Sequence, residues 1–139
     1  MRMLLMTFLF CLASGCGHGP ADLVLVCGRV MFEDKPVREV LVSFHGDGSE
    51  AVAFGTTDES GKFCVNTPGR GQGIPVGEYR VCLVAPMGLG RAPAASLEYD
   101  RLGGRYRNAS QPFTTLTITS ETSTLDDFVI EASGSSQRG

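Results

Sequence analysis

Five cysteines and two histidines are the first residues of this chain to weigh as ligands of a transition metal or as members of a catalytic set. No two cysteines stand in a C-x-x-C pair, and two histidines are too few for the usual zinc spacings. No Ser/His/Asp set can be built around histidines that lie in a Gly/Pro-rich stretch and in a turn. We therefore expect no metal, no cofactor and no catalytic residue. The residues concerned are Cys11, Cys16, Cys27, Cys64, Cys82, His18 and His45.

The first fifteen residues have the composition of a secretory signal peptide. Arg2 is their only charge, an apolar run extends over residues 3–12, and the small residues Ala-Ser-Gly follow at 13–15. The apolar run is too short to cross a bilayer as a helix. The sequence therefore predicts a signal peptide over residues 1–15.

Ala13-Ser14-Gly15-Cys16 resembles the lipobox of bacterial lipoproteins. In that family the cysteine thiol accepts a diacylglyceryl group and a dedicated peptidase cuts before it. The resemblance implies a lipid on Cys16 and a short tether over residues 16–22. Two or more acyl chains hold a protein stably, since each buried CH₂ contributes about 0.8 kcal/mol. An ordinary secretion signal cut at the same bond is the alternative, because Ala13 and Gly15 also form a small-x-small site.

Localisation follows from the same residues. A lipid on Cys16 implies an extracytoplasmic protein of the bacterial cell envelope, held to a membrane through its lipid. Gly17 stands where some inner-membrane lipoproteins carry an aspartate, so the outer membrane is favoured over the inner. No later apolar run approaches the length of a membrane-spanning helix.

The charge balance argues against nucleic acid as a partner. The chain has 12 Lys and Arg residues against 15 Asp and Glu. Since Arg2 is the only charge in the expected signal peptide, the remainder carries 11 basic and 15 acidic side chains, a formal charge of −4. Proteins that bind nucleic acid need a basic surface.

Short apolar runs with period-2 alternation follow the tether, separated by turns rich in Gly and Pro. They predict seven strands, which indicate an all-β sandwich. We expect this domain over residues 23–132 and a frayed tail over 133–139. The strands are expected at 23–32, 38–44, 51–57, 62–65, 78–85, 113–120 and 124–132, with a core that contains Val40, Val42, Phe44, Phe63, Tyr79, Val81 and Leu83.

Three segments, "CGRVMFEDKPVREVLVSF", "GTTDESGKFCVNT" and "PVGEYRVCLVA", resemble the carboxypeptidase regulatory-like domain, a transthyretin-type, Ig-like β-sandwich. In the second segment, Asp58 can hydrogen-bond back to the backbone while Gly61 supplies an unrestricted φ. Domains of this family mostly serve as binding modules, packing units or spacers rather than as enzymes. The related hydroxyisourate hydrolases use histidines that this chain lacks at comparable places, so we expect no enzyme.

The transthyretin-like topology also implies a disulfide. In that topology the first strand lies beside the fourth, and the fifth belongs to the other sheet. Cys27 and Cys64 would then share a face of neighbouring strands, where a Cα separation below about 7 Å permits a bridge. Cys82, at a solvent-facing position of its strand, would stand alone on the opposite surface. Three free thiols are the alternative, because the register of the strands decides the matter.

The segment 86–112 lacks strand alternation, and Pro93 could open a short helix over 93–102. It concentrates Arg and Tyr, residue types favoured at binding interfaces. A solvated loop is the alternative. The sequence thus indicates a structural or interaction module with an envelope protein or glycan as partner, or else a small-ligand or polysaccharide-binding module that uses this segment as a lid. The candidate interaction surface comprises Arg91, Tyr99, Arg101, Arg105, Tyr106 and Arg107.

Overall fold

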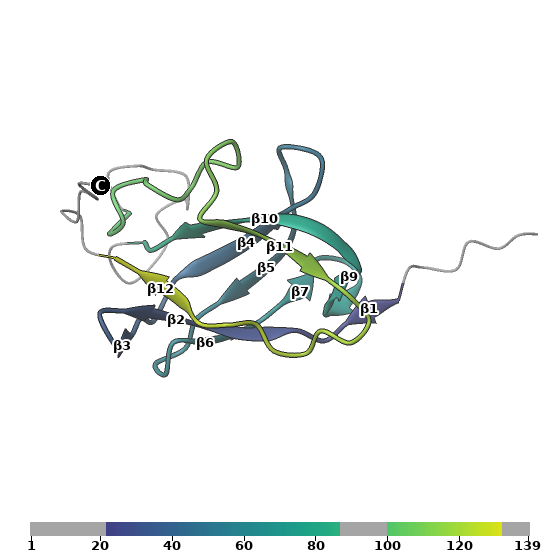
Figure 1. The fold of residues 1–139 in the computed structure, drawn as a ribbon, viewed down its shortest axis with the longest axis horizontal. Coiled ribbons are helices and arrows are strands. Elements are labelled where there is room, and N and C mark those ends of the chain that lie inside the picture. The colour runs from purple at the N-terminus through teal and green to yellow at the C-terminus, as the bar shows by residue number, and fades with distance from the viewer. Residues whose placement is uncertain (1–21, 87–99, 132–139) are drawn as a thin grey trace, which may run out of the picture.

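The computed structural model describes residues 22–86 and 100–131, and every regular element in these ranges is a β-strand (Figure 1). Three expected features lie outside the described residues: the signal peptide over 1–15, the lipid on Cys16 with the tether up to residue 21, and the tail over 133–139. The strands are β1 (Leu23–Val24), β2 (Cys27–Phe32), β3 (Lys35–Pro36), β4 (Leu41–His45), β5 (Ala51–Thr56), β6 (Lys62–Cys64), β7 (Asn66–Thr67), β8 (Gly71–Gln72), β9 (Ile74–Pro75), β10 (Gly77–Val84), β11 (Thr114–Ile118) and β12 (Phe128–Ile130).

Two sheets pack face to face, which confirms the expected all-β sandwich. The larger has six strands in the order β11-β10-β4-β5-β7-β8, and the smaller has the order β12-β2-β3, with β6 also paired to β2. Phe44 of the larger sheet and Phe63 of the smaller meet in the core, with ring centroids 6.5 Å apart. Strands β1 and β9 form a separate ladder at one end, while β3 and β12 lie at the other end (Figure 1).

The described residues contain more strands than the seven expected. The predicted strand over 23–32 is divided, because β1 pairs with β9 whereas β2 pairs with β6 and β12. The chain changes partner at Leu25 and Val26, between the two ladders. The other additional strands, β3, β7, β8 and β9, have only two residues each, too few to show a period-2 pattern.

The predicted core is confirmed. All seven of its expected members are buried, and Val26, Ile74, Ile118 and Ile130 join them in the same cluster. Tyr79 adds a polar contact, since its hydroxyl donates to the Pro75 carbonyl oxygen at 2.8 Å. Burial raises the pKa of the Tyr79 hydroxyl, which therefore stays protonated as this bond requires.

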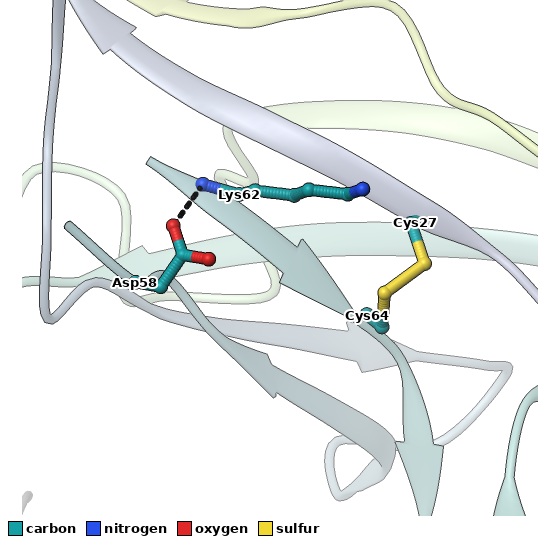
Figure 2. The surroundings of a disulfide bond; sticks show 4 residues. All are labelled: Cys27, Asp58, Lys62 and Cys64. Carbon is teal, nitrogen blue, oxygen red and sulfur yellow. Dashed lines mark hydrogen bonds between the residues drawn. A yellow bond between two sulfur atoms is a disulfide. The ribbon is translucent and has the colours of Figure 1, made fainter. Parts of the chain in front are cut away.

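The turn between β5 and β6 carries the chain from the larger sheet to the smaller one. Asp58 Oδ1 accepts hydrogen bonds from the Ser60 hydroxyl at 2.6 Å and the Ser60 amide at 2.9 Å. It also accepts one from the Lys62 amide at 3.0 Å (Figure 2). Gly61 has φ +75°, and a Cβ there would lie 2.6 Å from the Val30 carbonyl oxygen. The roles expected for Asp58 and Gly61 are confirmed.

The Asp58 turn predicts a pH dependence of stability. The hydrogen bond from the Ser60 hydroxyl, followed by that from the Lys62 amide, lowers the pKa of Asp58 below its ordinary value of 3.8. The pKa of Asp58 is lower in the folded state than in the unfolded state. The contribution of Asp58 to stability is therefore fully present above the unfolded-state pKa, and it is lost as the pH falls through the folded-state pKa. Asp58→Asn should therefore unfold at lower urea concentration than the wild type at pH 7, and the difference should shrink in acid.

The matched control is Glu59→Gln, in the same turn. The Glu59 side chain is 92% exposed, and its ion pair with Arg38 spans 4.0 Å. Its removal should leave the acid dependence of the urea midpoint unchanged, since exposed pairs contribute little. If the urea midpoints of the wild type and Asp58→Asn differ by the same amount at neutral and at acid pH, the role assigned to the Asp58 carboxylate is contradicted.

Candidate functional site

A polar cluster lies on the outer face of the larger sheet, where β4 pairs with β10. Ser43 and His45 of β4 stand opposite Cys82 and Arg80 of β10 in register. These four side chains point away from the core, since the alternate residues Phe44 and Val81 fill it. We call Ser43, His45, Arg80 and Cys82 the outer-face cluster.

His45 joins Ser43 to the β4–β5 hairpin. Its Nδ1 lies 2.9 Å from the Ser49 carbonyl oxygen, and its Nε2 lies 3.0 Å from the Ser43 Oγ. A carbonyl oxygen can only accept, so Nδ1 carries a proton and donates it. For neutral His45 this leaves Nε2 as the acceptor and the Ser43 hydroxyl as the donor. The pair thus has the hydrogen-bond pattern of a nucleophile and its base, but Ser43 is only 9% exposed, at a mid-strand position.

Arg80 ties two loops together across this face. Its Nη2 donates to the carbonyl oxygens of Gly46 and Gly48, both at 2.7 Å, and its Nη1 donates to that of Ala109 at 3.1 Å. Hydrogen bonds from a charged donor are stronger than those between neutral groups. Arg80 therefore fixes the 46–48 turn and the 107–111 loop on either side of the cluster.

The position expected for Cys82 is wrong in one respect. Cys82 is free, as expected, but only 1% exposed rather than on an open surface. Burial raises the pKa of its thiol, against the opposing effect of the Arg80 charge. The error arose because alternation along one strand shows only which face a residue occupies, and the outer face is covered at this position.

Cys27 and Cys64 form the expected disulfide. They stand directly opposite each other on β2 and β6, with their Cα atoms 4.0 Å apart (Figure 2). Cys64 is exposed and Cys27 is half-buried, so the bridge lies on the outer face of the smaller sheet. It closes a loop with a sequence separation of 37 residues.

Asp100 organises the described end of the 86–112 segment. Its buried carboxylate accepts hydrogen bonds from the amides of Ala85 and Leu102, each at 2.9 Å, and of Gly104 at 3.0 Å. Asp100 also forms a β-bridge with Pro86, so the expected helix over 93–102 does not include its last three residues. The remainder of that helix lies outside the described residues.

The described members of the candidate interaction surface have different partners. Tyr106 packs edge-to-face on Phe113 with ring centroids 5.1 Å apart, and so belongs to the edge of the core. Arg105 lies over the Tyr106 ring at 5.0 Å, whereas Arg101 donates to the Arg38 carbonyl oxygen at 2.7 Å. Arg107 is exposed and lines a cleft beside Arg80. Arg91 and Tyr99 lie outside the described residues.

The clefts of the described surface are open and mixed in character. One of about 390 Å³ lies between the two loops that Arg80 joins, and contains His45, Asp47 and Arg107. Another of about 520 Å³ lies beside β9 and β10 and contains Val52, Val76 and Tyr79 together with Arg70 and Glu78. Among the described residues, no three His, Cys, Asp or Glu side chains are grouped to hold a metal ion.

Sequence reasoning missed Ser43, His45 and Arg80 as one cluster. They belong to strands β4 and β10, which are far apart in the chain and are brought opposite each other only by the sheet register. An arginine at an outward position of the most regular predicted strand is the sequence signal for a polar outer face, whereas the half-burial of Arg80 is seen only in the structure.

Comparison with known proteins adds little to this geometry. No protein-family model matches the chain, and no curated protein matches it. Among solved structures, a DUF3823 family protein from Parabacteroides merdae matches with a TM-score of 0.38 and 15% sequence identity. The match covers 81% of this chain and 46% of that one, so the chain spans just under half of that protein's length. In the described ranges, no helix is long and apolar enough to cross a membrane.

Proposed function

We propose that this protein is a non-enzymatic lipoprotein of the bacterial cell envelope, whose carboxypeptidase regulatory-like sandwich serves as a structural or interaction module. The observation that carries the proposal is the run of small residues that leads into Cys16, directly after a short apolar stretch. A diacylglyceryl group on Cys16 would hold the domain at the surface of a membrane.

The disulfide supports an extracytoplasmic location. Bridges such as Cys27–Cys64 persist in oxidising compartments and are rare in the cytosol. The first strand also begins at Leu23, seven residues after Cys16. Seven residues span at most about 25 Å, so a lipid on Cys16 would keep the β1–β9 end of the sandwich close to the bilayer.

The outer-face cluster favours a binding or structural role over catalysis. The Ser43 hydroxyl is nearly buried, and Arg80 already donates to three carbonyl oxygens. A nucleophile must reach the reacting atom, and charge that develops there needs donors that are free to meet it. The inward packing of Tyr106 also favours an interaction module over a lid that binds polysaccharide.

The intact mass of the protein from the membrane fraction tests the anchor. We expect cleavage after Gly15 and additional acyl mass on Cys16. Cys16→Ala should leave either uncleaved precursor or unacylated soluble product. Cys11→Ala is the matched control, because it changes a cysteine of the same N-terminal stretch that follows large residues, and it should leave cleavage and acylation unchanged. A wild-type protein that is soluble and carries no acyl mass would refute the proposal.

A further inference from the structure

Strand β11 forms one edge of the six-stranded sheet. It pairs with β10 over its whole length, from Val81↔Thr114 to Gly77↔Ile118, and β10 is its only neighbour among the described strands. Five consecutive residues make it the longest of the strands that end a sheet in the described ranges. Such an edge presents unpaired backbone groups that can accept another strand.

The register fixes which backbone groups of β11 point away from β10. The Val81 carbonyl accepts from the Phe113 amide and the Leu83 amide donates to the Tyr106 carbonyl, so odd-numbered residues of β10 face β11. Their partners Thr114, Leu116 and Ile118 consequently bond to β10. The amides and carbonyls of Thr115 and Thr117 point away from it, and both residues are exposed.

Three other strands that end a sheet, β3, β8 and β12, are protected in ways that β11 is not. Strand β3 is two residues long and consists of Lys and Pro, and β8 is also two residues long. Strand β12 has three residues, with Asp127 before it and Glu131 after it. Short length, Pro and charge all discourage edge pairing. Residues 113–120, "FTTLTITS", contain neither charge nor Pro.

We propose that β11 pairs with the β11 strand of a second copy of this chain, antiparallel and around a two-fold axis at Leu116. Thr115 then exchanges both backbone hydrogen bonds with Thr117 of the second copy, and Thr117 does so with Thr115. All four outward backbone groups of each copy gain a strand partner, and the Thr115 carbonyl oxygen also accepts a long bond of 3.5 Å from the Thr114 hydroxyl. Leu116 faces its own counterpart as a non-hydrogen-bonded pair. This side chain is half-buried on the core side of β11, and the pairing covers its exposed part.

Charge favours a second copy as the occupant. A two-fold axis places the same short stretch of the two copies side by side, so like charges on that edge would meet and repel each other. Uncharged Thr and Leu carry no such penalty, and Thr–Thr neighbours across strands are favourable. Pairing through one strand buries less area than a stable dimer needs, so the dimer is weak and forms at the high local concentration of a shared membrane or compartment.

Cross-linking tests both the dimer and its register. Leu116→Cys should give a disulfide-linked dimer on a non-reducing gel after mild oxidation, because facing non-hydrogen-bonded residues have Cα atoms about 4.5 Å apart. Thr115→Cys is the matched control, since residue 115 faces residue 117 of the second copy and should not cross-link. The wild-type chain, which has all the other cysteines, gives the background.

A third variant tests the backbone bonds. Thr117→Pro removes an amide that points away from β10, so it should abolish the Leu116→Cys cross-link while the unfolding midpoint stays near that of the wild type. The proposal is overturned if Leu116→Cys gives no more disulfide-linked dimer than the wild type. It is also overturned by equal cross-linking through residue 115, or by cross-linking that survives Thr117→Pro in a folded chain.

Discussion

Replacing Leu83 with alanine is expected to lower the free energy of unfolding by about 2–5 kcal/mol. Leu83 has no exposed surface and lies in the middle of the sandwich, where β10 pairs with Val42 of β4. The substitution removes buried methyl groups and leaves a cavity, because close-packed neighbouring side chains relax only partly into the space. Urea unfolding of the disulfide-intact protein measures the loss.

Leu25→Ala is the control for this prediction. It removes the same atoms from a side chain that is 64% exposed, so its cost should stay within about 0.5 kcal/mol. Similar losses for the two variants would contradict the assignment of Leu83 to the inward face of β10.

The inward faces of the longer strands could be predicted from the sequence. Val40, Val42 and Phe44 occupy alternate positions of a β-rich run, and this period-2 pattern is a local property of the chain. Asp58 and Gly61 were predictable for the same reason, because a turn is built from residues close in sequence. Local patterns of this kind determine most of the core.

The partners of the strands could not be predicted in the same way. The division of 23–32 into β1 and β2 depends on β9, about fifty residues later in the chain, whose Ile74 pairs with Val24. The sequence of the β1 segment alone has no feature that specifies this partner. The resemblance to a known topology did place Cys27 beside Cys64, because that inference used the arrangement of strands and not only local alternation.

The candidate site shows the same limit. Cys82 was expected on an open surface, but it is only 1% exposed. Arg80 holds two loops, which contain Gly46 and Ala109. Such contacts join segments that are far apart in sequence, and strand alternation does not show them.

Loss of the Cys27–Cys64 bridge is expected to lower the free energy of unfolding by about 4 kcal/mol. The bridge closes a loop with a sequence separation of 37 residues, and a cross-link of that span removes about this much chain entropy from the unfolded state. Replacing both cysteines with serine should add little further cost, since Cys64 is exposed and Cys27 half-buried. Urea unfolding of the double variant Cys27→Ser/Cys64→Ser measures the effect.

Reductant and thiol counting provide the controls for this prediction. Dithiothreitol should shift the urea midpoint of the wild type toward that of the double variant and leave the variant itself unchanged. In the domain that follows the tether, no thiol should react quickly while the protein is folded, because Cys82 is buried and burial raises its pKa. One thiol should appear on unfolding without reductant, and three with it. Three reactive thiols in the unfolded, non-reduced domain would show that Cys27 and Cys64 are not joined.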